Sequence, residues 1–149
     1  MRISKPKFWR NKIGFLSAIL IPLSIIYIFF SFLRKKFTIT KTFDIPIICV
    51  GNIYIGGTGK TPTSMLLFKE LTKLGKKPII IKKYYKEHID EYRMIKKNSL
   101  DLITCKNRPD GVREAKKFNY STVILDDGFQ DYKIRKDINI ICFNQNQLI

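Results

Sequence analysis

Cysteine and histidine are scarce in this chain of 149 residues. The three cysteines, Cys49, Cys105 and Cys142, stand in apolar stretches, are odd in number and lack the spacing of a metal site. This pattern favours buried, reduced thiols in a cytosolic domain over a disulfide framework or a zinc site. The one histidine, His88, belongs to a charged helical stretch, and we assign it no role.

Negative charge is also scarce, because 12 Asp and Glu residues stand against 28 Lys and Arg residues and leave a formal net charge of +16 at pH 7. A basic surface of this kind suits nucleic acid, anionic lipid or phosphorylated substrates. No known RNA-binding motif is present, so we expect no nucleic-acid partner. With 45% hydrophobic and 27% charged residues, the composition is that of a globular chain, long enough for one domain with a core.

The first region, residues 1–36, has basic ends and an apolar middle. Residues 13–33 carry no charge, although Pro22 interrupts them, and basic residues stand on both sides. A helix of about 20 residues spans about 30 Å, the thickness of the hydrocarbon core. A membrane-spanning helix and an interfacial helix both fit, and a buried helix is the third alternative. No small-residue cleavage site follows, so a signal peptide is not expected.

The second region, residues 37–149, alternates between strand and helix patterns, which predicts an α/β fold of the P-loop type with a mostly parallel sheet. Strands are predicted at 45–50, 78–81, 100–105, 121–125 and 138–143, and helices at 60–74, 87–97 and 109–118. A parallel strand normally leads into a crossover helix, but none follows the last strand. We therefore expect this lobe to be incomplete.

A glycine-rich turn between the first strand and the first helix predicts a phosphate-binding loop. Only such a turn lets several backbone N–H groups point at phosphate oxygens, and the helix that follows adds its positive dipole end. Lys60 would reach the β- and γ-phosphates, and the Thr61 hydroxyl would ligate Mg²⁺. The predicted nucleotide-binding residues are Tyr54, Ile55, Gly56, Gly57, Thr58, Gly59, Lys60 and Thr61.

The loop departs from the standard motif at its first position, where Tyr54 replaces glycine. Gly56 and Gly57 would supply the necessary flexibility instead. An ordinary glycine turn before a helix is the alternative interpretation, but the strand before the loop and the helix after it both fit a phosphate site.

Two aspartates, Asp126 and Asp127, follow the strand at 121–125 and are predicted to be catalytic residues and metal ligands, together with Thr61. A P-loop kinase needs a carboxylate at the end of a neighbouring strand for Mg²⁺. Open α/β folds also bind their ligands at the carboxyl ends of strands. A solvated turn is the alternative.

Two further charged pairs have open roles. Asp90 is the predicted general base, although acids at the start of a helix, such as Asp90 and Glu91, also serve as dipole partners. Lys82 and Lys83 follow the second strand, where they would either bind an anionic substrate or form a solvated charge pair.

With these residues placed, the sequence resembles the tetraacyldisaccharide 4′-kinases of Gram-negative bacteria along nearly its whole length. Four features carry the resemblance: the apolar segment with Pro22-Leu23-Ser24, residues 50–53 leading into 56–62, Asp126-Asp127-Gly128-Phe129-Gln130, and Arg135-Lys136-Asp137-Ile138. The resemblance implies transfer of the ATP γ-phosphate to the 4′-hydroxyl of a tetraacylated disaccharide 1-phosphate, with Mg²⁺. It also implies an anionic glycolipid substrate and a place at the cytoplasmic face of the inner membrane.

The chain departs from the family pattern at several positions. Lys82-Lys83-Tyr84-Tyr85 stands where the family usually has Ser-Arg-Gly-Tyr, and Ile89-Asp90-Glu91-Tyr92 is the nearest match to Gly-Asp-Glu-Pro. Asp131 replaces a histidine, and the family's second lobe is absent. A P-loop ATPase or GTPase switch at the membrane and an inactive truncated nucleotide-binding fragment are the alternatives. No Asn-Lys-x-Asp motif for guanine is present, and the oligomeric state is left open.

Overall fold

The computed structural model describes residues 15–52, 59–98 and 100–143. Within this range the chain divides after Thr38 into two units, which we describe separately. The predicted boundary between residues 36 and 37 lies close to this division.

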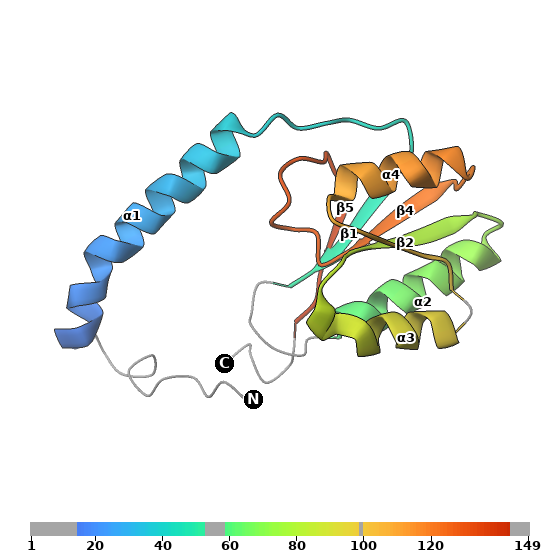
Figure 1. Cartoon of the computed structure of the whole chain (residues 1–149), viewed down its shortest axis with the longest axis horizontal. Helices are drawn as coiled ribbons and strands as arrows, with labels where there is room; N and C mark the ends of the chain where they lie inside the picture. Colours follow the sequence, from blue (N-terminus) through green and yellow to red (C-terminus); the bar gives the residue numbers. More distant parts are fainter. Residues whose placement is uncertain (1–14, 53–58, 99, 144–149) are drawn as a thin grey trace. The chain divides into compact units, whose positions relative to one another are not determined.

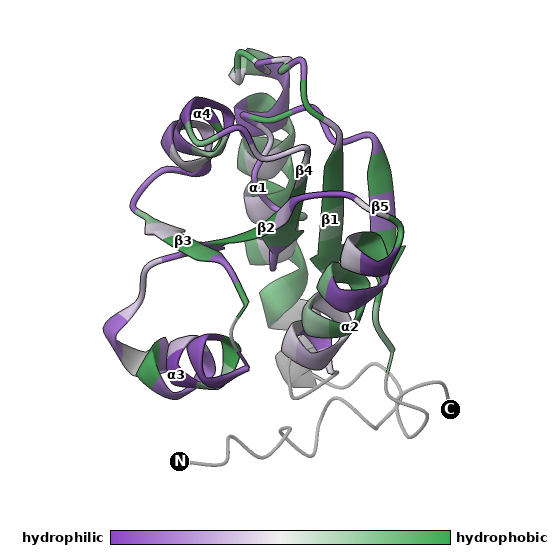
Figure 2. Ribbon diagram, turned by 90° about the vertical axis from the view of Figure 1, so that its right-hand side faces the viewer, coloured by the Kyte–Doolittle hydropathy of each residue, from purple (hydrophilic) through white to green (hydrophobic). Residues whose placement is uncertain are grey.

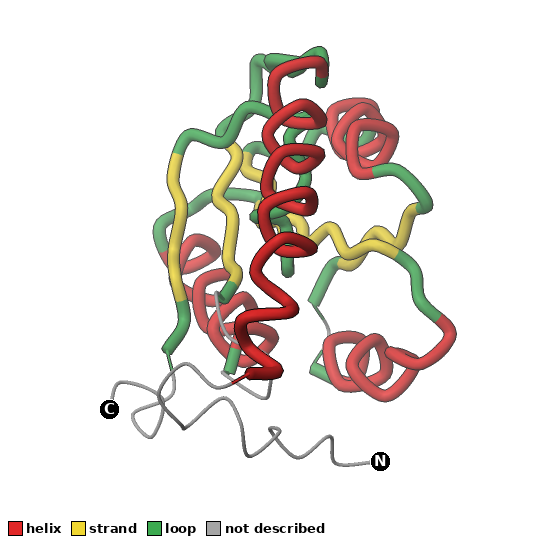
Figure 3. Tube along the Cα trace, turned by 90° about the vertical axis from the view of Figure 1, so that its left-hand side faces the viewer, coloured by secondary structure: helices red, strands yellow, loops and turns green. Residues whose placement is uncertain are grey.

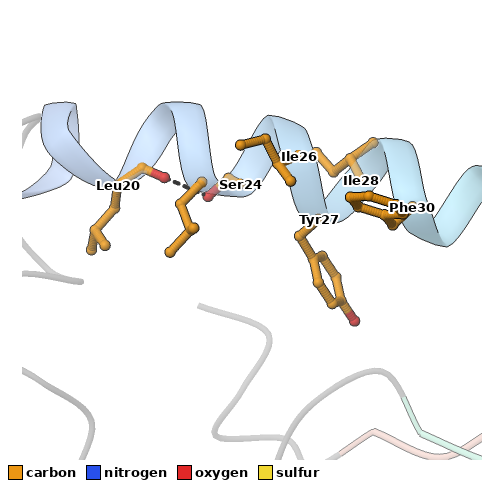
Figure 4. A pocket seen from close by; sticks show the side chains of 7 residues that line it. Leu20, Ser24, Ile26, Tyr27, Ile28 and Phe30 are labelled. Atoms are coloured by element: carbon orange, nitrogen blue, oxygen red, sulfur yellow. Dashed lines mark hydrogen bonds between the residues drawn. The ribbon is translucent and has the colours of Figure 1, made fainter.

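The first unit contains one helix, α1 (Phe15–Phe37), which continues through Pro22. Within α1 the Ser24 hydroxyl donates a hydrogen bond to the Leu20 carbonyl oxygen, one turn earlier in the helix, at 3.0 Å (Figure 4). Apolar side chains of α1 such as Tyr27 and Phe30 are exposed, and its last turn is basic. No helix in the described part of the chain is both long enough and apolar enough to cross a bilayer.

The second unit is built on a five-stranded sheet with the order β3-β2-β4-β1-β5, in which all neighbouring strands are parallel. Its strands are β1 (Ile47–Gly51), β2 (Pro78–Lys83), β3 (Leu102–Cys105), β4 (Thr122–Asp126) and β5 (Ile138–Ile141). The inner strands are continuous apolar runs because helices cover them on both faces. Figure 2 shows these runs as hydrophobic ribbon at the centre of the unit. The predicted parallel sheet is thus confirmed.

Helices lie on both faces of this sheet (Figures 1 and 3). They are α2 (Lys60–Lys73), α3 (Ile89–Lys97), which follows the 3₁₀ turn η2 (Lys86–His88), and α4 (Arg108–Lys117). Successive strand residues point to opposite faces. Ile79 and Ile81 therefore pack in the core under α4, whereas Ile80 packs in the core under α2 and α3.

The crossover from β1 through α2 to β2 leaves room for β4 between these strands. The register aligns Asp126, the last residue of β4, with Val50 on one side and Lys82 on the other. The ends of three strands therefore meet at one edge of the sheet, beside the start of α2.

The segment after β4 returns to the opposite end of β1, where the Asp137 carboxylate accepts a hydrogen bond from the Ile47 N–H at 2.8 Å. Asp137 belongs to the fourth stretch of the family resemblance. Its position gives this motif a structural role, since it anchors the start of the strand that leads to the phosphate loop.

Candidate active site

The start of α2 brings Lys60 to the carboxyl ends of β1 and β4. Lys60 Nζ donates to Asn52 Oδ1 at 2.9 Å and lies 3.2 Å from Asp127 Oδ1. The backbone enters α2 through Gly59, whose φ of 79° lies in the left-handed region that favours glycine. The other predicted loop residues, Tyr54, Ile55, Gly56, Gly57 and Thr58, lie outside the described residues.

Asp126 is fully buried, and its carboxylate accepts hydrogen bonds from two hydroxyl groups in the first turns of α2. The Thr61 hydroxyl lies 3.0 Å from Asp126 Oδ2, and the Ser64 hydroxyl lies 3.4 Å from Asp126 Oδ1. Thr61 therefore contacts the acid at the end of β4, and this contact joins helix and strand at the base of the site.

Lys82 completes this buried cluster. Its side chain is 4% exposed, and Nζ lies 2.5 Å from Asp126 Oδ2, donates to Glu91 Oε2, and lies 3.3 Å from Thr61 Oγ1. Burial by itself lowers the pKa of Lys82, but the two carboxylates outweigh it and raise the pKa above its ordinary value. The Lys82 ammonium is therefore charged at neutral pH.

Glu91 enters the cluster from α3, whereas Asp90 does not. Burial raises the pKa of Glu91, but the hydrogen bond and charge of Lys82, aided by His88 and Thr61, outweigh this and lower it. The Asp90 carboxylate is 97% exposed and lies 3.9 Å from Arg93. Adjacent residues of a helix point about 100° apart, because one turn takes 3.6 residues, so only one of the two acids can face the sheet.

Arg108, the first residue of α4, holds the turn after β4. Its guanidinium donates to the carbonyl oxygens of Asp126 at 3.2 Å and of Asp127 at 2.6 Å, and lies 3.6 Å from Asp131 Oδ2. Asp127 has a φ of 58°, an uncommon value for a residue with a side chain. Arg108 thus binds the backbone at the point where it adopts this conformation.

Together these side chains line a small pocket at the carboxyl edge of the sheet. The lining residues are Lys60, Lys82, Lys83, Tyr85, His88, Glu91, Arg108, Asp126 and Asp127. His88 Nδ1 is buried, has no hydrogen-bond partner among the residues that the structure describes, and lies 3.7 Å from Glu91 Oε2. The pocket therefore combines a helix start, four Lys or Arg side chains and three carboxylates, a combination suited to binding and positioning a polyphosphate.

A family model for tetraacyldisaccharide-1-P 4′-kinase, LpxK, matches residues 16–149. The chain belongs to this family. A tetraacyldisaccharide 4′-kinase from Pelagibacter ubique is 39% identical over 145 residues, which are 97% of this chain and 46% of that protein. A second, from Nitrobacter winogradskyi, is 32% identical over 154 residues, covering 92% of this chain and 45% of that protein.

The fold also resembles that of a solved LpxK. A crystal structure of LpxK from Aquifex aeolicus in complex with ATP matches with a TM-score of 0.70 and 27% identity, over 89% of this chain and 50% of that one. This chain therefore spans about half the length of the tetraacyldisaccharide 4′-kinases that it matches.

The three predicted metal ligands, Thr61, Asp126 and Asp127, do not converge on one point in the described part of the chain. Thr61 and Asp126 lie together and offer the oxygen atoms that Mg²⁺ prefers, but Asp127 lies beside Lys60 instead. No group of three His, Cys, Asp or Glu residues that could hold a metal forms among the described residues. Because Lys82 Nζ lies within hydrogen-bond distance of both Thr61 and Asp126, Mg²⁺ does not fit between them as these side chains lie.

Sequence reasoning did not assign roles to Glu91, Arg108 or Asn52. The signal for Glu91 was present, since it adjoins Asp90. Arg108 stands one residue before a predicted helix start and shows no pattern that marks it. Lys82 was predicted to be either substrate-binding or solvated, and the structure shows it buried among carboxylates.

Proposed function

We propose that this chain is the nucleotide-binding lobe of an ATP-dependent kinase that phosphorylates the 4′-hydroxyl of a tetraacyldisaccharide 1-phosphate in lipid A biosynthesis. One observation carries the proposal. Lys60 and Thr61, at the start of α2, lie beside Asp127 and Asp126 at the end of β4, where β1 delivers the phosphate loop. Family membership supports the same substrate and reaction.

In this proposal Lys60 and the backbone amides of residues 54–61 hold the phosphates of ATP. A lysine at the start of a helix supplies a point charge close to the terminal phosphate, and the helix adds its positive end. Thr61, Asp126 and Asp127 are the residues that the sequence predicts as ligands of the Mg²⁺ that accompanies ATP, but the ion does not fit between Thr61 and Asp126 while Lys82 Nζ lies there, so the charge neutralisation proposed here comes from Lys60. Catalysis then consists of positioning and charge neutralisation rather than covalent chemistry with the protein.

Asp90 stays the predicted base for the acceptor hydroxyl. Its exposed carboxylate is open to a substrate that arrives from outside this lobe, whereas Glu91 is engaged by Lys82. A base must lie within hydrogen-bond reach of the proton that it removes, so this role requires the acceptor hydroxyl to bind beside the exposed side of α3.

We further propose that α1 lies on the cytoplasmic face of the inner membrane. Its apolar side chains are exposed, and Arg34, Lys35 and Lys36 close its last turn. Such a helix buries its apolar side chains at the boundary of the acyl chains while its cations meet anionic headgroups. This position brings the lobe to a lipid substrate.

A second candidate is a chain that binds ATP without transferring phosphate, which is favoured by the Lys82 ammonium because it lies where a metal ion would have to bind Thr61 and Asp126. The experiment compares this chain alone with the chain joined to the part of the Pelagibacter relative beyond the match. Transfer of labelled γ-phosphate from ATP to tetraacyldisaccharide 1-phosphate is measured for both proteins. We expect transfer by the joined protein, and a loss of about 100-fold or more in its Lys60→Ala variant because a charge at the transferred phosphate is removed.

Lys69→Ala is the matched control, since Lys69 is an exposed lysine on the same helix. Near-normal transfer by the Lys60→Ala variant would contradict the proposal. ATP binding without transfer in both proteins would support the second candidate.

A further inference from the structure

Three oxygen atoms from three different elements converge on one point in the buried cluster. They are Thr61 Oγ1 of α2, Asp126 Oδ2 of β4 and Glu91 Oε2 of α3. Lys82 Nζ donates hydrogen bonds to the carboxylates of Asp126 and Glu91 and lies 3.3 Å from the Thr61 hydroxyl. The ammonium of β2 thus occupies the centre of an oxygen-only set of ligands.

This point requires a cation. Asp126 is fully buried, and its carboxylate and that of Glu91 are held within reach of the same nitrogen, so the two negative charges would repel each other without one. An ammonium group has three N–H donors and no acceptor. It therefore matches three oxygen acceptors, and its charge offsets the desolvation of Asp126, which is fully buried, whereas Glu91 is 42% exposed.

The same set of ligands is suited to a hard divalent ion, because carboxylate and hydroxyl oxygens are what Mg²⁺ and Mn²⁺ bind. We propose that Lys82 is a built-in cation that takes the place of a divalent ion in this cluster. It holds Thr61, Asp126 and Glu91 together when no metal is present and excludes free divalent ions from the position. This inference depends only on the placement of the four side chains and is independent of kinase activity.

The test uses Mn²⁺ alone, without nucleotide, on the 149-residue chain. Binding is measured by the loss of the free-ion signal in electron paramagnetic resonance. We expect no saturable Mn²⁺ site in the wild type and one saturable site in Lys82→Met, which binds at least about tenfold more tightly than the nonspecific binding of Mn²⁺ to the wild type, because Met keeps an aliphatic side chain but removes the charge that excludes the ion.

Lys73→Met is the matched control. Lys73 also bonds a carboxylate, that of Glu70 at 2.7 Å, but both side chains are exposed, and among the described residues no other acid pairs with Lys73. We expect this variant to bind no more Mn²⁺ than the wild type. A gain in Lys73→Met as large as that in Lys82→Met would overturn the proposal, since removal of any lysine would then have the same effect.

Two further measurements keep the test decisive if Lys82→Met is too unstable to isolate. Lys82→Met/Glu91→Gln removes one negative charge together with the ammonium, and we expect it to fold and to show a saturable Mn²⁺ site that the wild type lacks; the absence of such a site in the folded double variant would overturn the proposal. In the wild type, the melting temperature should not respond to Mg²⁺. A wild-type Mn²⁺ site that Glu91→Gln abolishes would show that metal and ammonium share the cluster and would refute the inference.

Discussion

The Thr61 hydroxyl at the start of α2 lies 3.0 Å from Asp126 Oδ2 at the end of β4. These residues are far apart in sequence, and they meet because β4 enters the sheet between β1 and β2. The contact fixes the first turn of the helix against the strand that carries the acidic motif. It makes the phosphate-loop end of α2 and the Asp-Asp-Gly turn parts of one site.

Asp126 should be the most important carboxylate of this site for stability. Asp126→Asn keeps the size of the side chain but removes the charge beside Lys82, and loss of one partner of a buried ion pair costs about 3–5 kcal/mol. The measurement is urea unfolding of the variant and the wild type. Asp127→Asn is the control, because Asp127 is 51% exposed in its pair with Lys60, and exposed pairs contribute about 1 kcal/mol or less. Equal losses for both variants would contradict the burial of the Asp126–Lys82 pair.

Stability should depend on pH at the acid end through Glu91. The pKa of Glu91 is lowered from its ordinary value of 4.5, so its contribution to the free energy of unfolding is present above pH 4.5 and is lost as the pH falls through the lowered value. The pKa of Lys82 is raised from 10.5, so its contribution persists through neutral pH and is lost only above that value.

The check of this pH dependence is urea unfolding of the wild type and Glu91→Gln between pH 7 and acid pH. The wild type should lose more stability below pH 4.5 than the variant does. Parallel curves would show that Glu91 is not paired with Lys82 in the folded chain.

Two of the motifs touch at Gly51, where β1 ends. A Cβ atom at Gly51 would lie 2.5 Å from Cδ2 of the Phe129 ring, closer than atoms can pack. Gly51→Ala should therefore destabilise the chain by about 1–3 kcal/mol through overpacking. Thermal unfolding measures the loss. Gly51→Ala should cost less stability when Phe129 is already replaced by Leu than it costs in the wild type, because the smaller side chain leaves room for the Cβ atom. Equal costs in both backgrounds would count against the contact.

Arg108 should stabilise the turn after β4. Arg108→Met removes the hydrogen bonds to the carbonyl oxygens of Asp126 and Asp127, and bonds to charged groups contribute about 1.5–3 kcal/mol each. We expect both lower stability and weaker ATP binding, measured by urea unfolding and calorimetry. Arg113→Met is the control, because Arg113 is half exposed and pairs with Asp110 of its own helix. Unchanged ATP binding in a folded Arg108→Met variant would limit Arg108 to a structural role.

The sequence predicted the parts of the site that depend on strand order. A glycine-rich turn after an apolar strand and a pair of acids after another strand predicted that Lys60, Thr61 and Asp126 meet at one edge, because the carboxyl ends of parallel strands lie together. The structure brings these three residues together. The sheet and its helices were predictable for the same reason, since buried parallel strands read as continuous apolar runs.

The sequence could not predict which side chains of α3 and β2 face inward. The helix was expected from residue 87, but α3 begins at Ile89 after a 3₁₀ turn, and one residue changes the direction of a helical side chain by about 100°. Glu91 rather than Asp90 reaches the cluster because Tyr92 and Ile95 are the buried residues of α3, and at about 100° per residue Glu91 lies on their side of the helix and Asp90 on the other. Lys82 is the last buried residue of β2, which lies next to β4. That neighbourhood depends on the strand order and not on the local sequence.

The central claim is that the cluster around Lys60 holds the phosphates of ATP. Equilibrium binding of ATP to the 149-residue chain, measured by calorimetry for the wild type, Lys60→Ala and Lys69→Ala, tests it most directly. We predict that Lys60→Ala lowers the affinity by about 10- to 100-fold, the equivalent of one charge-assisted contact, and that Lys69→Ala matches the wild type. Equal affinity of Lys60→Ala and the wild type, with both proteins folded, would contradict the claim.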